Sequence, residues 1–267
     1  MLKIILLGDV LASEFVLLNM LAKPYQRQDG FLLGNYSINL SGMTIPMSRS
    51  LLKFIQAVLP LTLYMPLTID NLDKDRYTPR KNYDTNLLEP GLFQMVDSTF
   101  VLTDELWMKE GQVKDNGLNN IKAIATLIEQ QTVNYDFQYY QQEMPINAGV
   151  MVISDGRSMF KNTQQVIVQV EEGRVFDEAK FTQILADHQL MTQMRRYFLV
   201  LQYHSMTSLQ EYSIPAEVSE YCQNIFIETR KAEQEALGEV KTNADTFHKW
   251  LSLSRLMAVS DGEITLS

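Results

Sequence analysis

The first half of the chain alternates short apolar runs with stretches of helical spacing, and this alternation constrains the fold more than any other feature. Apolar runs of a few residues, bounded by turn residues, are typical of buried strands. We expect strands over residues 3–7, 63–68, 99–103, 149–153 and 165–170, and helices over 13–22, 48–58 and 118–130. Strands that alternate with helices predict an α/β fold with a mostly parallel sheet flanked by helices.

The pattern changes twice further along the chain. Residues 132–140 alternate apolar and polar side chains and then reach Pro145, which predicts a hairpin. From about residue 176 the strand signals end, and Asn243 is placed to cap a last helix. We therefore predict an α/β core over 1–174 and a helical lid over 175–267.

Composition restricts the classes of function. The 267 residues carry a net charge of -9, which argues against general affinity for nucleic-acid backbones. Cys222 is the only cysteine, so no internal disulfide forms and a reducing compartment is expected. The three histidines lack metal-ligand spacing, so we expect no metal site. Charges or prolines interrupt the apolar segments 2–21 and 51–69, so we expect no membrane span.

The run Thr99-Phe-Val-Leu-Thr-Asp104-Glu105 is an apolar strand that ends in two carboxylates. Carboxylates after a strand also start helices, because they accept N–H hydrogen bonds and favour the positive helix end. Asp104 and Glu105 are therefore candidates for a catalytic role or for a structural cap, and the structural interpretation is favoured.

This strand, followed by residues 128–133 and the strand at 149–153, resembles the middle of an AAA-type ATPase, and most closely the core of the minichromosome maintenance (MCM) helicase subunits. The start of the chain, with Gly8 and Asp9 after an apolar run, resembles their phosphate-binding loop. Where that loop carries Lys and then Ser or Thr, this chain has Glu14 and Phe15. A carboxylate about 4 Å from a phosphate opposes it by roughly 4 kcal/mol at a surface-like dielectric. The alternative interpretation of Gly8 and Asp9 is a plain strand-to-helix turn.

The same resemblance assigns further residues. Asp104 and Glu105 match the residues that hold magnesium and activate water in active relatives, and Asp155 falls near their sensor asparagine. Asp245 and Thr246 lie where the helicase lid supplies an arginine. Acids or lost bases at the lysine, sensor and lid-arginine positions together imply no ATP turnover and no bound cofactor.

The predicted hairpin carries the aromatic residues Tyr135, Phe137, Tyr139 and Tyr140 and no Lys or Arg between residues 134 and 142. Aromatic side chains stack on bases, but a nucleic-acid groove also needs basic companions. We interpret the four aromatics as packing residues or as contacts to a protein partner, with packing favoured.

Several longer phrases, among them Leu33-Gly-Asn-Tyr-Ser-Ile-Asn-Leu-Ser-Gly42 and Ser154-Asp-Gly-Arg-Ser158, occur in the order found in the family of MCM-binding proteins. This resemblance implies a nuclear protein that joins MCM subunits and regulates their assembly or removal from chromatin. The chain lacks the leading region expected of that family, so we expect a fragment or a truncated gene product.

Together these inferences predict an AAA-like α/β domain with a helical lid that acts as a non-enzymatic binding module for MCM subunits, without direct DNA binding. Two alternatives remain open. One is a slow or partner-dependent ATPase in which Asp104 and Glu105 serve a site completed by another subunit. The other is a DNA-bound replisome component, which the acidic charge disfavours.

Overall fold

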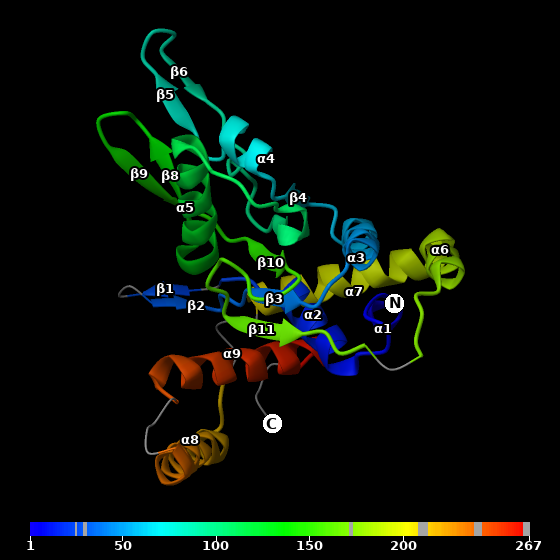
Figure 1. Cartoon of the computed structure of the whole chain (residues 1–267). Helices are drawn as coiled ribbons and strands as arrows, with labels where there is room; N and C mark the ends of the chain where they lie inside the picture. Colours follow the sequence, from blue (N-terminus) through cyan, green and yellow to red (C-terminus); the bar gives the residue numbers. More distant parts are fainter. Residues whose placement is uncertain (25, 29–30, 171–172, 208–212, 238–241, 264–267) are drawn as a thin grey trace. The chain divides into compact units, whose positions relative to one another are not determined.

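The computed structural model describes residues 1–24, 26–28, 31–170, 173–207, 213–237 and 242–263 (Figure 1). It divides into two compact units, Met1–Arg196 and Tyr197–Ser267, and each is described by itself. The division of the chain at residue 175 into core and lid stays a prediction.

A parallel sheet of five strands forms the centre of the first unit. Its strands are β3 (Ile38–Ser41), β4 (Thr62–Pro66), β7 (Phe100–Asp104), β10 (Gly149–Ile153) and β11 (Gln164–Ile167). Their order across the sheet is β11-β3-β10-β7-β4, and every neighbouring pair is parallel. All residues of β3, β7 and β10 are buried, as expected for a parallel sheet with both faces covered. The structure confirms the predicted α/β class and four of the five predicted strands.

The predicted strand over residues 3–7 was wrong. Leu2–Ile5 form the short helix α1, and Leu7 and Gly8 then adopt positive φ angles of 50° and 97° in a turn. A short apolar run fits a buried helix as well as a buried strand, because periodicity does not separate the two at this length. The fifth strand is β3 instead, which lies inside the sheet between β11 and β10.

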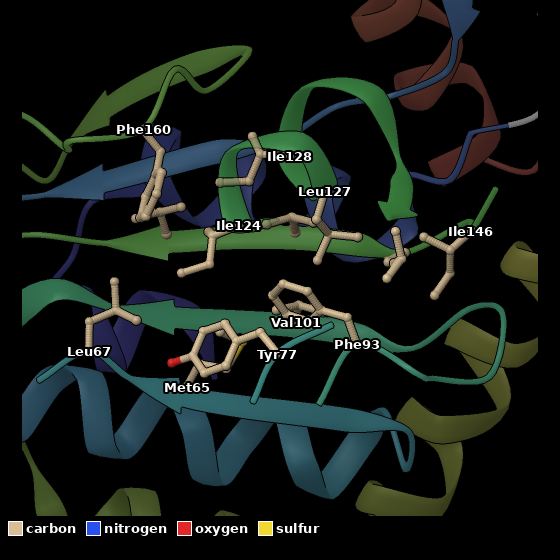
Figure 2. Close-up of a cluster of buried hydrophobic side chains, with 14 of the residues drawn as sticks. Met65, Leu67, Tyr77, Phe93, Val101, Ile124, Leu127, Ile128, Ile146 and Phe160 are labelled. Atoms are coloured by element: carbon tan, nitrogen blue, oxygen red, sulfur yellow. The ribbon is translucent and has the colours of Figure 1, made fainter. Parts of the chain in front are cut away.

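Three helices lie where they were predicted, each beginning three residues earlier. They are α2 (Val10–Leu21), α3 (Ile45–Val58) and α5 (Asp115–Gln130). Helix α2 contacts β3, β10 and β11, and Figure 1 shows α5 on the other side of the sheet. Between α5 and the sheet lies the core in Figure 2, in which Ile124, Leu127 and Ile128 pack with Val101 and Met65.

A second, mixed sheet of four strands projects from this core (Figure 1). Its strands are β5 (Arg80–Asn82), β6 (Leu87–Glu89), β8 (Thr132–Asp136) and β9 (Gln141–Pro145), in the order β6-β5-β8-β9. The antiparallel pair β8–β9 confirms the predicted hairpin. The hairpin β5–β6 was not predicted. It joins the hairpin β8–β9 through the parallel pairing of Arg80 on β5 with Asp136 on β8.

The remaining elements are short connections in the first unit and the helices of the C-terminal segment. They are β1 (Gln26–Gln28), β2 (Phe31–Leu33), α4 (Ile69–Lys74), the 3-10 turn η1 (Glu105–Trp107), α6 (Glu178–Ala186), α7 (His188–Thr207), α8 (Ala216–Leu237) and α9 (Ala244–Ser260). The helical character after residue 176 is thus confirmed. Asn243 caps α9 as predicted, with its side chain accepting from the Thr246 N–H at 3.0 Å.

Within the second unit an aromatic cluster joins α8 to α9. The ring of Phe226 lies 5.0 Å from that of Phe247 and 6.4 Å from that of Trp250. Glu233 accepts hydrogen bonds from the backbone and hydroxyl of Thr242, each at 2.8 Å. Of the helices in the described ranges, none is both long and apolar enough to span a membrane.

Candidate functional site

The loops after β3, β7 and β10 meet at one edge of the parallel sheet, because parallel strands place their carboxyl ends together. This edge is where open α/β sheets bind ligands. Asp104 and Glu105 follow β7, and Asp155 follows β10, so the structure brings these three predicted acids to the same edge. The loop after β3 is tied to them, since the Gly42 N–H donates to the carbonyl of Asp155 at 2.8 Å.

Asp104 is completely buried and held by the chain itself. Its Oδ2 accepts hydrogen bonds from the hydroxyl groups of Ser48 at 2.5 Å and Tyr64 at 2.9 Å. The indole N–H of Trp107 lies 3.2 Å from the same oxygen. The other oxygen, Oδ1, accepts from the Leu106 N–H at 3.0 Å and caps η1.

These partners leave Asp104 little capacity for another ligand. A carboxylate accepts about four hydrogen bonds. Asp104 has three donors and a share of the Trp107 N–H, which also donates to the Tyr64 hydroxyl at 3.0 Å. Burial, followed by the charge of Asp104, raises the pKa of Tyr64 to about 12, so this hydroxyl stays a donor at neutral pH. A metal ion at Asp104 would have to displace at least one donor, which leaves a buried polar group unpaired.

Glu105 is also bonded internally, although less completely. Its Oε1 accepts from the Ser158 hydroxyl at 2.7 Å, and the Met159 backbone N–H bonds its carboxylate. Burial raises the pKa of Glu105, with a smaller contribution from Asp104, while the two hydrogen bonds act in the opposite direction. Glu105 thus connects the end of β7 to the loop after β10.

The sheet places a strand, a turn and a helix at β3–α3, which is the arrangement of a phosphate-binding loop. With Gly42 as the first glycine of G-x-x-x-x-G-K-[S/T], the lysine position is occupied by Ser48 and the next by Arg49. Phosphate binding in such a loop also requires free backbone N–H groups. Here the Gly42 N–H donates to Asp155 and the Met43 N–H to Ser154, and Pro46 has no N–H to donate.

The four predicted loop residues Gly8, Asp9, Glu14 and Phe15 lie elsewhere. Asp9 caps α2, with Oδ1 accepting from the Ala12 N–H, and its Oδ2 accepts from the Gln169 N–H at 2.8 Å. Gln169 follows β11, and two strands separate β11 from β7, a distance of about 14 Å at the usual strand spacing. Glu14 is exposed on α2 and Phe15 is half-buried. The structure does not bring these residues to Asp104, and Gly8 and Asp9 form a helix-initiating turn.

The hairpin aromatics divide into two groups. Tyr135 and Phe137 are half-buried, and Tyr135 packs against the core. Tyr139 and Tyr140 are exposed by 84% and 58%. The ring of Tyr140 stacks on that of Phe137 at 5.1 Å between centroids.

A second hairpin extends this exposed surface. The ring of Tyr83, from the β5–β6 connection, meets that of Tyr139 edge-on at 5.4 Å, and its hydroxyl donates to the Phe137 carbonyl at 3.0 Å. Leu87 and Leu88 on β6 are exposed as well, but as consecutive strand residues they point to opposite faces. We call the exposed tyrosines Tyr83, Tyr139 and Tyr140 the hairpin-tip patch.

Sequence reasoning missed the donors around Asp104 and the β5–β6 half of the patch. Ser48, Tyr64 and Ser158 carry no motif, and only the sheet order brings them near the two acids. The local signal available at residues 38–48 was Pro46, since proline favours the first turn of a helix. In the described residues no group of His, Cys, Asp and Glu is arranged to hold a metal ion.

The fold and the site define an α/β sheet protein in which two acids at the carboxyl edge, Asp104 and Glu105, are bound by side chains of the same chain. A family model described as mini-chromosome maintenance replisome factor matches residues 1–267, and the chain belongs to this family. Relatives named mini-chromosome maintenance complex-binding protein are 33% identical in Gallus gallus, 32% in Danio rerio and 31% in Homo sapiens. These alignments cover 98% of this chain but only 40% or 41% of the relatives, so the chain spans about two fifths of their length.

Proposed function

We propose that this chain is a non-enzymatic binding module that associates with subunits of the MCM helicase in the nucleus. In this proposal it regulates the assembly or disassembly of their complex during DNA replication. The names of its relatives support the choice of MCM subunits as the partner, since each is called a mini-chromosome maintenance complex-binding protein. The five-stranded parallel sheet serves as a divergent AAA-type frame that is kept for its shape.

The observation that supports a non-enzymatic function is that hydrogen-bond donors of the chain itself occupy the carboxylate of Asp104. A catalytic carboxylate has to exchange partners with magnesium or water during turnover. Asp104 instead holds together α3, β4 and η1 through Ser48, Tyr64 and Trp107. The missing lysine and the internally bonded N–H groups of the β3–α3 turn support the same conclusion.

The hairpin-tip patch is the surface that we assign to the partner. Apolar side chains gathered on a projecting sheet expose area that monomeric proteins usually bury, and such patches mark protein interfaces. Tyrosines at the centre of a patch are frequent anchors of binding energy. The patch also explains why the second sheet extends away from the core (Figure 1).

The test is a pull-down of the whole chain against each MCM subunit separately. We expect retention of at least one subunit in a manner that is independent of nucleotide. Failure to retain any subunit, with the chain folded by circular dichroism, would refute the proposed partner.

A partner-dependent ATPase is the second candidate function. The observation that favours it is the convergence of Asp104, Glu105 and Asp155 at one sheet edge, where a neighbouring subunit could add a base. Phosphate release by the chain mixed with the retained MCM subunit, with Asp104→Asn on this chain as control, separates the two candidates.

A further inference from the structure

A polar groove of about 630 Å³ lies between α5 and the second sheet, and none of the hairpin-tip tyrosines and none of Asp104, Glu105 and Asp155 lines it. Its wall is one stripe of α5, and its floor is the polar face of β8 with the start of β9. The stripe consists of Asn116, Asn119, Ala123, Thr126 and Gln130, which recur at intervals of three and four residues and so share one helix face. Another face of α5 carries Ile124, Leu127 and Ile128 into the core. Within the stripe, Asn116 donates to the carbonyls of Asp73 and Asp75 and so anchors the start of the helix, while Asn119, Thr126 and Gln130 have no such contact in the described residues.

The hydrogen-bonding capacity of this groove is largely unused. Among the described residues, the side chains of Asn119, Thr126, Gln130 and Gln141 make no hydrogen bond within the chain. On the floor, Thr132 Oγ1 and Asn134 Oδ1 are shielded from solvent and also lack a partner in the described part of the chain. Rotation of the Asn134 side-chain amide by half a circle exchanges its N–H donors and its oxygen acceptor. This side chain can therefore present either a donor or an acceptor to the groove. Buried polar atoms without partners are uncommon in native proteins and call for a ligand or water.

We propose that this groove binds an extended polypeptide segment of about six residues. Amide side chains offer a donor and an acceptor side by side, which matches the N–H and C=O groups of a peptide main chain. The stripe runs from Asn116 to Gln130, a rise of about 21 Å, which is the span of about six residues in extended conformation. Ala123 lies midway along it and leaves the room that a main chain needs.

The lining disfavours two other classes of ligand. Sites for small organic molecules are predominantly apolar, whereas this lining is mostly amide, hydroxyl and charged. Phosphate backbones require unpaired cations, but Arg76 pairs with Glu89 and Arg80 pairs with Asp136 at 3.3 Å. Lys122 remains as a cation outside any ion pair in the described residues.

Charge sets the direction of the bound segment. Lys122 and Glu129 both line the groove, seven residues apart on α5, which is about 10 Å along the helix axis. Neither forms an ion pair within the described residues. The segment therefore carries an acidic side chain beside Lys122 and a basic one beside Glu129, in a fixed order along its sequence.

The test uses the whole chain and a library of randomised seven-residue peptides displayed on phage. Peptides selected on the native chain are made with a fluorescent label, and their affinity is measured by anisotropy. We expect peptides with one acid and one base in a constant order. The variant Ala123→Gln, which fills the groove, should weaken their binding at least tenfold. The matched variant Leu118→Gln adds the same side chain to an exposed α5 position outside the groove and should leave affinity unchanged.

Two more variants exclude a merely structural effect. The double exchange of Lys122→Glu with Glu129→Lys should select peptides with the opposite order of charges. Asn134→Leu removes the unpaired buried oxygen, so it should abolish peptide binding without lowering the thermal midpoint. An empty selection, peptides that bind the Ala123→Gln variant equally, or an unchanged charge order on the exchanged variant would each overturn the proposal. None of these results bears on the pull-down of MCM subunits, because the hairpin-tip patch is intact in every variant.

Discussion

The hydroxyl of Ser48 donates a 2.5 Å hydrogen bond to Oδ2 of Asp104, and this bond joins the first turns of α3 to the end of β7. Both residues are buried, at 1% and 0% exposure, so water does not compete for the bond. The bond therefore fixes the Asp104 carboxylate to the helix that follows β3, so the chain itself occupies this acid at the carboxyl edge of the sheet.

Replacing Asp104 by Ala should destabilise the chain strongly. The change removes the cap of η1 and leaves the hydroxyl groups of Ser48 and Tyr64 without their acceptor, while the Trp107 N–H keeps its bond to the Tyr64 oxygen. A buried unpaired group costs about 1–3 kcal/mol, so we expect a loss of at least about 2 kcal/mol in the free energy of unfolding. Urea denaturation gives this value, and Asp155→Ala, at an exposed position, is the control with a change within about 0.5 kcal/mol. An Asp104→Ala variant as stable as its control would contradict the structural role.

The isolated chain should show no measurable ATP hydrolysis. No lysine follows Gly42 within the β3–α3 turn, and the Gly42 and Met43 N–H groups are bonded within the chain. Phosphate release is the measurement, with Asp104→Asn as control because it keeps an oxygen acceptor at this position. A rate that this substitution abolishes would support the ATPase alternative.

Glu105 should make stability depend on pH in a definite direction. Its folded-state pKa is raised by burial above the ordinary value of about 4.3. The native state then binds the proton more tightly than the unfolded state. The contribution of Glu105 to the free energy of unfolding therefore falls as the pH rises from about 4.3 through the raised pKa. Below about pH 4.3 the carboxyl is protonated in both states and this contribution is fully present.

The variant Glu105→Gln isolates this effect, because the amide oxygen still accepts from Ser158 and does not titrate. The thermal midpoint of the variant relative to the native chain should increase between pH 4 and pH 7. A difference in thermal midpoint that stays constant over this range, or decreases, would show that burial does not raise the pKa of Glu105.

The hairpin-tip patch should decide binding to the MCM subunit retained in the pull-down. Tyr139→Ala combined with Tyr140→Ala removes two exposed anchors, and truncation of interface anchors typically costs about 2 kcal/mol or more, roughly thirtyfold in affinity. Tyr83→Ala, on the other hairpin, should weaken the same binding, since its ring contacts Tyr139. Co-purification and circular dichroism are the measurements.

Glu105→Gln serves as the matched variant for this experiment and should bind MCM subunits as well as the native chain does. Loss of binding by Glu105→Gln with the fold preserved would mean that the carboxyl edge, and not the patch, contacts the partner.

Affinity for duplex or single-stranded DNA should be negligible at physiological salt. The chain carries a net charge of -9, and the two arginines near the second sheet are paired with acids. Fluorescence anisotropy with both DNA forms checks this expectation. Micromolar binding that weakens steeply with salt would reveal a basic surface and support a DNA-bound role.

The sequence by itself determined the elements whose signal is local. The helix α5 follows from apolar residues at helical spacing, the hairpin β8–β9 from alternation followed by Pro145, and the start of α9 from the Asn243 cap. In each case the residues that give the signal are close in the sequence, along a single helix or across one tight turn. Local propensity and periodicity therefore suffice.

Only the tertiary structure decided which of these elements meet. Ser48 and Tyr64 lie 56 and 40 residues from Asp104, and only the strand order brings them to it. The apolar run at Leu2–Ile5, interrupted only by Lys3, forms a helix, whereas Ile38-Asn-Leu-Ser41, with two apolar and two polar residues, forms a fully buried strand inside the sheet. Burial against residues that are distant in the sequence determines whether each segment forms a helix or a strand. No local pattern encodes it, because the free energy that separates the two conformations comes from contacts made only after the chain has folded.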